Sequence, residues 1–213
     1  MKKLVIIGAG GFGREVQLII QRINEVKKTY DLIGFIDDRI ELNSKVNESI
    51  ILGDIDSLIN YNESLNVVIA IGNSENRIKT YNKLKSLKEF EYPNIIDPSS
   101  QINESRLGKG NIICANSFFT VNYELIDFVI VNLACTVGHD CMLDSFVTVY
   151  PGVNISGNVN IGAGTEIGTG TKIIQGINIG SDTIVGAGSV VIRDLPSRVT
   201  AVGSPAKVIK ERK

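Results

Sequence analysis

Residues 159–173 read VNIGAGTEIGTGTKI, and within this stretch an isoleucine returns at every sixth residue. The same spacing continues in both directions through the second half of the chain, where the recurring residue is always apolar. These positions are Leu107, Ile113, Phe119, Leu125, Val131, Val137, Leu143, Val149, Ile155, Ile161, Ile167, Ile173, Ile179, Val185 and Val191. A fixed short period without helical spacing predicts a repeat architecture built from short strands.

Each apolar position is usually followed, four places later, by a small or β-branched residue, as in Cys135, Cys141 and Thr165. Because positions four and six of a repeat lie two apart in a strand, their side chains point to the same, buried face. Positions two and three fall between strands and form a turn. Three such units close a triangular coil of about 18 residues, and stacked coils pair as parallel strands about 4.8 Å apart. Residues 107–191 therefore supply between four and five coils.

The only histidine of the chain lies inside this repeat, in the stretch TVGHDCML at residues 136–143. His139 and Asp140 occupy the turn positions of the unit that starts at Val137, so both side chains lie outside the core. At a corner, neighbouring side chains can point the same way, which allows a hydrogen bond between this pair. Gly157 follows His139 by 18 residues and therefore stacks on the same corner. An imidazole base beside a backbone N–H predicts an acyl-transfer site, although an arbitrary lone histidine is more often a solvated turn residue.

The first part of the chain has a different pattern, in which strand-like and helix-like segments alternate. The strand-like segments are residues 3–7, 31–37 and 67–72, and the helix-like segments are residues 14–24 and 74–87. This alternation predicts βαβ units around a parallel sheet. The change of pattern places the division between an α/β domain at residues 1–95 and a β domain at residues 96–213.

A glycine-rich turn follows the first strand-like segment. Gly8, Gly10 and Gly13 satisfy G-x-G-x-x-G between a strand and a helix, where backbone N–H groups favour a phosphate. Asp37 ends the second strand, at the place where a ribose is often bound, and Asn73 ends the third. The motif alone fits an NAD site, as in an oxidoreductase, but the region is too short for both halves of a dinucleotide fold. A mononucleotide-binding half fits better.

Composition excludes several classes of protein. With a net charge of −1, the chain lacks the concentrated basic surface that a nucleic-acid partner needs. No apolar run reaches the ~18 residues of a membrane span, and we expect no signal peptide. The 3 cysteines suggest a reduced cytoplasm rather than a disulfide framework. A single histidine also excludes a metal site built from clustered imidazoles, so we expect no metal.

The repeats, the ending AVGSPAKVI (residues 201–209) and the α/β half together resemble a known family across essentially the whole chain. The family is that of the hexapeptide-repeat nucleotide-sugar acetyltransferases, also labelled sialic acid O-acetyltransferase-like. The resemblance implies an α/β N-terminal Rossmann-like half-domain followed by an all-β left-handed parallel β-helix. It implies a homotrimer that transfers an acetyl group directly from acetyl-CoA to the amino group of a nucleotide-linked sugar. A 4-amino-4,6-dideoxy sugar is the expected acceptor.

The resemblance also implies roles for individual residues. His139 is the implied general base, and Asp140, in place of the commoner glutamate, is its acidic partner. The acetyl-CoA site is implied at Thr148, Gly157, Thr169 and Ala187. The nucleotide-sugar site is implied at Gly10, Gly11, Phe12, Asp37, Asp38 and Asn132, to which Asn73 is added from its place at a strand end.

Two other functions stay open at this point. O-acetylation of a sugar hydroxyl, such as that of a sialic acid, would use the same base. A nonenzymatic nucleotide-binding scaffold would not need His139 at all. The sequence leaves the nucleotide base open among UDP, GDP and CMP.

Overall fold

The computed structural model describes residues 1–61, 64–103 and 106–212. The chain forms two compact units, Met1–Pro98 and Ser99–Lys213. Of the helices in the described ranges, none has both the length and the apolar character needed to cross a membrane.

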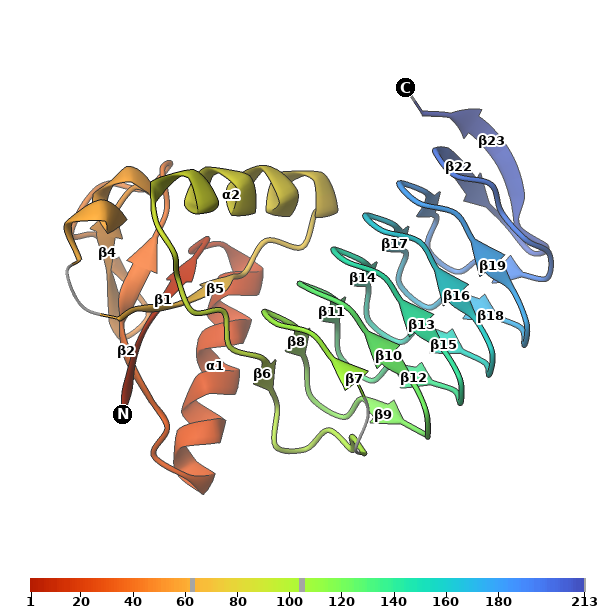
Figure 1. Cartoon of the computed structure of the whole chain (residues 1–213). Coiled ribbons are helices and arrows are strands. Elements are labelled where there is room, and N and C mark those ends of the chain that lie inside the picture. Colours follow the sequence, from red (N-terminus) through yellow and green to blue (C-terminus); the bar gives the residue numbers. More distant parts are fainter. Residues whose placement is uncertain (62–63, 104–105, 213) are drawn as a thin grey trace. The chain divides into compact units, whose positions relative to one another are not determined.

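The first unit is an α/β fold around a sheet with the strand order β3-β4-β2-β1-β5 (Figure 1). The strands are β1 (Lys2–Ile7), β2 (Tyr30–Ile36), β3 (Lys45–Val46), β4 (Ser49–Gly53) and β5 (Asn66–Ile69). The other elements are α1 (Gly11–Val26), the 3-10 helix η1 (Asp56–Asn60), α2 (Ser74–Leu87) and β6 (Ile95–Ile96). Strands β1, β2, β4 and β5 are parallel, which confirms the predicted parallel sheet, and β3 forms an antiparallel pair with β4. The sequence did not predict β3, β4 or η1.

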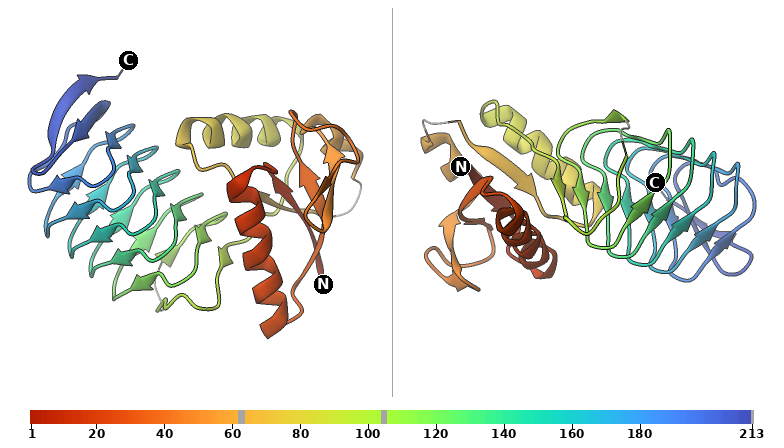
Figure 2. Two further views of the ribbon diagram at one scale, coloured as in Figure 1. Left: turned by 180° about the vertical axis from the view of Figure 1, so that it is seen from behind. Right: turned by 90° about the horizontal axis from the view of Figure 1, so that it is seen from below.

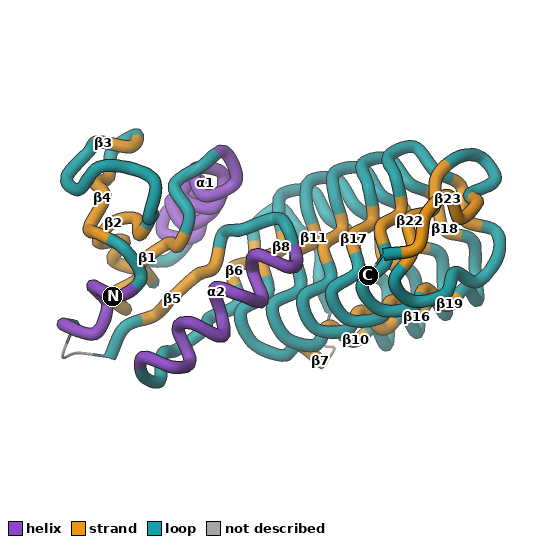
Figure 3. Tube along the Cα trace, turned by 90° about the horizontal axis from the view of Figure 1, so that it is seen from above, coloured by secondary structure: helices purple, strands orange, loops and turns teal. Residues whose placement is uncertain are grey.

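The two helices lie on opposite faces of this sheet (Figures 2 and 3). Strand β1 is buried on both faces from Leu4 to Ile7, as expected for a strand covered by helices on each side. Helix α1 begins immediately against the end of that strand. A Cβ built on Gly13 would lie 1.8 Å from the backbone oxygen of Gly8, so only glycine permits this close approach of helix and strand.

The second unit is a three-sided parallel β-helix. Each side is a parallel sheet: β7-β10-β13-β16-β19, β8-β11-β14-β17-β20 and β9-β12-β15-β18-β21 (Figure 1). The strands are β7 (Arg106–Leu107), β8 (Ile112–Ile113), β9 (Phe118–Phe119), β10 (Glu124–Leu125), β11 (Ile130–Val131), β12 (Thr136–Val137), β13 (Met142–Leu143), β14 (Thr148–Val149), β15 (Asn154–Ile155), β16 (Asn160–Ile161), β17 (Glu166–Ile167), β18 (Lys172–Ile173), β19 (Asn178–Ile179), β20 (Ile184–Val185) and β21 (Val190–Val191). Each ends on one of the predicted apolar positions.

The predicted register is confirmed by the pairing. Val137 pairs with Ile155, and Val131 pairs with Val149, so neighbouring strands in a sheet are one 18-residue coil apart. The apolar positions are buried except for the first, Leu107, which is half-buried. The residues four places on, including Cys135 and the fully buried Thr165, fill the same core.

The turns of the β-helix share one backbone conformation. At each turn from Gly110 to Gly188, the third residue after the apolar position has a φ between 55° and 79°, in the left-handed region. Glycine supplies some of these positions, and Asp or Asn supplies most of the others, because a short polar side chain tolerates this conformation. Asp140, with a φ of 58°, is one of them.

A hairpin follows the repeats. Strand β22 (Val199–Val202) pairs with β20 in parallel, and β23 (Lys207–Glu211) returns antiparallel to β22. The residues of β23 are exposed.

Candidate active site

The single histidine lies at the corner between strands β12 and β13. The backbone oxygen of His139 accepts a hydrogen bond of 2.7 Å from the N–H of Asn158 in the next coil, which anchors the turn. The side chains of His139 and Asp140 are 48% and 53% exposed, so both face outward. The imidazole Nδ1 lies 2.8 Å from Oδ2 of Asp140, so the two neighbouring side chains form the hydrogen bond that the corner position allows.

The carboxylate of Asp140 is held from two sides. Its Oδ2 pairs with His139, and its Oδ1 accepts a hydrogen bond of 3.1 Å from Nδ2 of Asn122, one coil earlier. These hydrogen bonds, first that of His139 and then that of Asn122, lower the pKa of Asp140. An ionised carboxylate only accepts, so the neutral imidazole carries its proton on Nδ1 and presents a free lone pair on Nε2.

Gly157 lies directly beside that lone pair. A Cβ built on Gly157 would lie 2.3 Å from Nε2 of His139, so the ring occupies the space that any other residue would fill. Within the described part of the chain, no backbone oxygen accepts a hydrogen bond from the Gly157 N–H. The corner therefore combines a proton acceptor with an uncommitted backbone donor, the pair of groups that stabilises the transition state of acyl transfer.

The cysteines lie in the core and not at this corner. Cys114, Cys135 and Cys141 are all buried free thiols. Burial raises the pKa of Cys135 to about 11 and also raises the pKa of Cys141. A thiol with a raised pKa is a poor nucleophile at neutral pH, because the thiolate is the reactive form. Among the described residues, no three His, Cys, Asp or Glu side chains gather closely enough to hold a metal ion.

The structure does not bring all the predicted coenzyme residues to the His139 corner. Thr169 and Ala187 stack one coil apart on a different corner, which follows strands β17 and β20, and both are exposed. Thr148 has no exposed surface, so its side chain does not reach solvent in this conformation. Asn132 is also buried, and its Oδ1 accepts a hydrogen bond of 2.7 Å from the N–H of Leu133.

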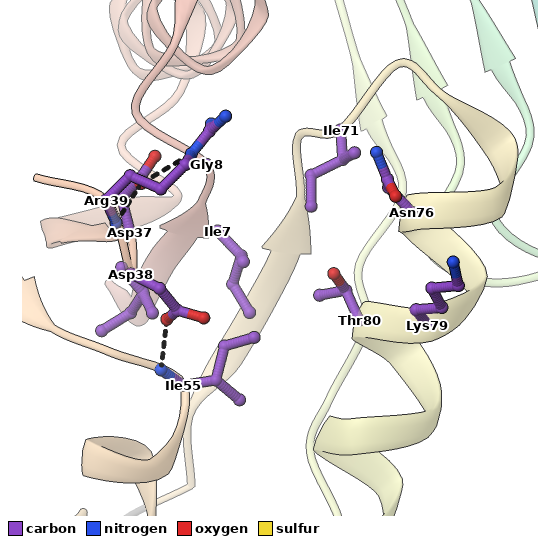
Figure 4. A pocket seen from close by; sticks show the side chains of 11 residues that line it. Ile7, Gly8, Asp37, Asp38, Arg39, Ile55, Ile71, Asn76, Lys79 and Thr80 are labelled. Carbon is purple, nitrogen blue, oxygen red and sulfur yellow. Dashed lines mark hydrogen bonds and ion pairs between the residues drawn. The ribbon is translucent and has the colours of Figure 1, made fainter.

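The α/β unit contains a cavity of about 330 Å³ beside the carboxyl ends of β1 and β2. Four isoleucines form its apolar part, and Gly8, Asp37 and Asp38 contribute to its lining (Figure 4). The isoleucines are Ile7, Ile36, Ile55 and Ile71. The carboxyl edge of a parallel sheet is the usual place for a ligand in an open α/β fold.

Several residues that were predicted to bind the nucleotide accept hydrogen bonds from backbone N–H groups near this cavity. Buried Asp37 accepts hydrogen bonds from the N–H groups of Ala9 at 2.9 Å and Arg39 at 3.0 Å, so it ties two loops together. Asp38 accepts a hydrogen bond of 3.3 Å from the N–H of Ile55. The side chain of Asn73 caps α2 through the N–H of Asn76.

The predicted phosphate loop lies at the start of α1. Gly10 is the N-cap of the helix, and Gly11 and Phe12 are its first residues. A Cβ built on Gly10 or Gly11 would meet no atom within 4 Å, so the backbone here is open to an approaching ligand. The described lining of the cavity includes Gly8 from this loop but not Gly10, Gly11, Phe12 or Asn73.

Four polar residues of the cavity lining were missed in the sequence. Asn76, Lys79 and Thr80 come from one face of α2, and Arg39 follows β2. Figure 4 shows the α2 side chains on the opposite side of the cavity from Asp37 and Asp38. The i, i+3, i+4 spacing of the three helical residues was the available signal, because it places them on one face. Lys79 forms an ion pair of 2.6 Å with Glu75.

Comparison with known proteins gives matches that extend along the chain. Residues 3–84 match the family model described as the PglD N-terminal domain. The chain is 31% identical over 213 residues to GDP-perosamine N-acetyltransferase of Escherichia coli O157:H7, covering 96% of this chain and 95% of that protein.

Solved structures agree with this match. The acetyltransferase domain of PglB from Neisseria gonorrhoeae FA1090 superposes with a TM-score of 0.88 at 34% identity, covering 98% of this chain and 100% of that one. It has also been solved with acetyl coenzyme A. PerB from Caulobacter crescentus, solved with CoA and GDP-perosamine, has a TM-score of 0.88 at 31% identity and covers 99% of this chain and 98% of its own. The predicted fold class, an α/β half-domain followed by a left-handed parallel β-helix, is confirmed.

Proposed function

The chain belongs to the family of hexapeptide-repeat nucleotide-sugar acetyltransferases, and from this premise we propose that it N-acetylates a nucleotide-linked amino sugar with acetyl-CoA. The proposed acceptor is a 4-amino-4,6-dideoxy sugar. The observation that carries the proposal is the corner at which Nε2 of His139 lies against Gly157 while Nδ1 is held by Asp140. Nε2 of His139 can accept a proton from a sugar amine, and the N–H of Gly157 can donate to the oxygen of a thioester.

The proposed mechanism is direct transfer. The amino nitrogen attacks the thioester carbonyl of acetyl-CoA, and Nε2 of His139 takes the proton that the nitrogen loses. The Gly157 N–H donates to the oxyanion of the tetrahedral intermediate, a contribution of about 10²–10³-fold in comparable sites. When the C–S bond breaks, the proton passes from His139 to the leaving CoA sulfur. Asp140 stabilises the imidazolium between these two steps without itself becoming protonated.

The α/β unit is proposed to hold the nucleotide. Its cavity offers apolar walls for a base, and Asp38 and the polar face of α2 offer hydrogen-bonding partners. The open N-terminus of α1 at Gly10 and Gly11 suits the diphosphate, because helical N–H groups and the helix dipole favour an anion. Residues 1–95 would thus bind the nucleotide sugar, and residues 96–213 would carry out the transfer.

A homotrimer is proposed from the separation of the candidate coenzyme residues. Thr169 and Ala187 lie on a different corner of the coil from His139. One side of the triangle, about six residues of extended chain or roughly 15–20 Å, separates two corners. A neighbouring copy could place its Thr169 corner against His139, and the acetyl-CoA site would then lie between subunits. Light scattering tests this, because a monomer at micromolar concentration would contradict it.

The proposed roles of Thr148 in binding acetyl-CoA and of Asn132 in binding the sugar require a change in side-chain conformation. Thr148 and Asn132 are buried, so a ligand would contact them only after a side-chain rearrangement. We further propose that the enzyme works in the cytoplasm, in glycan biosynthesis, which suits its buried free thiols.

The deciding experiment is a panel of UDP-, GDP- and CMP-linked amino sugars mixed with acetyl-CoA, in which release of free thiol is followed. We expect turnover with one nucleotide series and none with the corresponding sugars that lack the amino group. Turnover of a hydroxyl acceptor alone would favour O-acetylation. Nucleotide binding without any transfer, in a protein that folds normally, would favour the scaffold alternative.

A further inference from the structure

We propose that Asn122 is a positioning residue for this site: by holding Asp140, it fixes the imidazole of His139 with Nε2 free for catalysis. The inference rests on the proposed function. Asn122 precedes Asp140 by 18 residues and occupies the same turn position one coil earlier. Its Nδ2 lies 3.1 Å from Oδ1 of Asp140, while Oδ2 lies 2.8 Å from Nδ1 of His139.

The backbone places the two side chains in parallel. Asn122 and Asp140 have φ values of 56° and 58°, so both leave their turns from the same left-handed conformation. The N–H of Asp140 also donates a hydrogen bond of 3.1 Å to the backbone oxygen of Val121. This bond sets the spacing of the two turns at about one inter-strand distance of 4.8 Å. The side-chain amide of Asn122 is therefore already positioned to donate to the carboxylate of Asp140.

The need for such a residue follows from the exposure of Asp140. Its side chain is 53% exposed, and without a second contact the carboxylate could rotate and bind water in place of the imidazole. An aspartate also keeps its carboxylate close to its own turn, within reach of the turn below. A glutamate would carry the carboxylate one methylene further out, away from Asn122. Asn122 and Asp140 therefore form a matched pair in this chain.

The consequence is control over the tautomer of His139. With Oδ1 occupied by the amide, Oδ2 remains aimed at Nδ1, and the Nδ1–H tautomer is favoured. Without the amide, the carboxylate would populate orientations in which Nδ1 has no acceptor. Part of the neutral imidazole would then carry its proton on Nε2, where it could not act as a base.

The first test uses the fact that the chain has 1 histidine, so its imidazole nitrogen NMR spectrum contains a single ring. We expect the neutral ring to be in the Nδ1–H form in the wild type, and the Nε2–H fraction to rise in Asn122→Ala. We expect kcat to fall about 10-fold, with the KM values for both substrates unchanged. An unchanged tautomer ratio in Asn122→Ala would overturn the proposal.

Asn160→Ala is the matched control. Its Nδ2 donates a hydrogen bond of 3.0 Å to Oδ1 of Asn178, also 18 residues away, but this contact joins strands β16 and β19 and involves neither His139 nor Asp140. The Asn160→Ala variant also loses an amide hydrogen bond between neighbouring coils. We expect its kcat and the tautomer ratio of His139 to match the wild type. An equal loss of kcat in Asn160→Ala would mean that any such contact matters, and would overturn a specific role for Asn122.

A double-mutant cycle with Asp140→Glu tests the pairing itself. We expect Asn122→Ala to cost about 10-fold with Asp140 present and less than about 2-fold after Asp140→Glu, since interacting residues are not additive. A cost of 10-fold in both backgrounds would show that Asn122 acts independently of Asp140, against the proposal. The tautomer measurement needs no substrate. It therefore separates failure of this inference from failure of the proposed function, which the substrate panel reports.

Discussion

Gly13 in the α/β unit and Gly157 in the β-helix are both positions where a Cβ would clash, but the atoms in the way differ. At Gly13 the nearest atom is the backbone oxygen of Gly8, at 1.8 Å, in a fixed strand end. At Gly157 it is Nε2 of His139, at 2.3 Å, at the tip of a side chain that can rotate away. The first glycine is required for the fold, and the second leaves room for a reactive group.

The acidic residues of the two units show the same contrast. Asp37 is buried and accepts hydrogen bonds from two backbone N–H groups, so it stabilises the loops around the cavity. Asp140 is exposed and accepts from two side chains, one of which is the candidate base. The difference teaches that the motif aspartate of the α/β loops satisfies the backbone, whereas the aspartate beside His139 is held by side chains and faces solvent. Each prediction below tests one side of this contrast.

The largest effect is expected for His139→Ala. It removes the proposed base, and general base catalysis contributes about 10²–10⁴-fold to a rate. We expect acetyl transfer to fall by about 1,000-fold, measured as free thiol release at saturating substrates, with the unfolding transition unchanged because the side chain is exposed. Since the chain has 1 histidine, no other imidazole can take over. Retention of more than a few per cent of the wild-type rate would contradict the role of His139.

Gly157→Ala comes next and tests the β-helix side of the comparison. The added methyl group would displace the imidazole and leave the backbone in place, so we expect kcat to fall about 100-fold, with little change in stability. Steady-state kinetics and a urea unfolding curve measure the two effects. In the double variant with His139→Ala, the methyl group should have no further effect.

Gly162→Ala is the control for this prediction. A Cβ there would meet the backbone nitrogen of Ser181 at 2.6 Å, in a turn away from His139. We expect it to lower the free energy of unfolding while the folded enzyme keeps its kcat. A normal kcat in Gly157→Ala, or an equal loss of kcat in Gly162→Ala, would contradict this account. Gly157 would then not differ from a glycine that is needed only for backbone packing.

Gly13→Ala tests the α/β side. Its Cβ would collide with a backbone oxygen, so we expect the free energy of unfolding of that unit to fall by about 1–3 kcal/mol. Gly11→Ala is the matched variant at the same helix start, where a Cβ meets no atom within 4 Å. We expect it to be neutral or about 0.5 kcal/mol more stable, since alanine restricts the unfolded chain. Urea unfolding monitored by circular dichroism measures both, and equal stability of the two variants would contradict this account.

The β-helix could be predicted from the sequence almost residue by residue. Each coil of the β-helix has 18 residues, so the number of residues between two positions shows whether they lie on the same side or corner. This is why Gly157 could be placed on the His139 corner, and why Cys135 and Cys141 could be placed in the core. The same counting places Thr169 on another corner, but burial depends on neighbouring side chains and not on register alone. The full burial of Thr148 therefore could not be read from the repeat.

The α/β unit was less predictable because its site is built from loops and a helix face. Strong hydrophobic runs revealed β1, β2 and β5, while β3 has only two residues and owes its existence to a hairpin with β4. The glycine motif marked the turn before α1, but the helix begins at Gly11, inside the motif and three residues before the predicted start at Arg14. The cavity residues Arg39 and Lys79 are ordinary surface cations in the sequence, and only the packing of α2 beside the sheet edge gives them a common cavity.

The smallest expected effect is in the titration of Asp140. Its pKa is lowered below the ordinary value of 3.8 by hydrogen bonds from His139 and then Asn122. A carboxylate with a lowered pKa in the folded state contributes stability above its ordinary pKa, and that contribution is lost as pH falls through the lowered value. The pair with His139 should therefore stay intact from pH 7 down to below pH 4. Because the carboxyl group is exposed, we expect little change in unfolding free energy over that range.

Carbon NMR of the Asp140 carboxyl group measures this directly. We expect a wild-type midpoint below 3.8, a rise toward that value in His139→Ala, and a smaller rise in Asn122→Ala, in the order of the two causes. A wild-type midpoint at or above 3.8 would mean that the exposed carboxylate does not hold the imidazole in solution. Asp140 would then resemble a solvated turn residue, and the contrast with the engaged carboxylate of Asp37 would rest on burial alone.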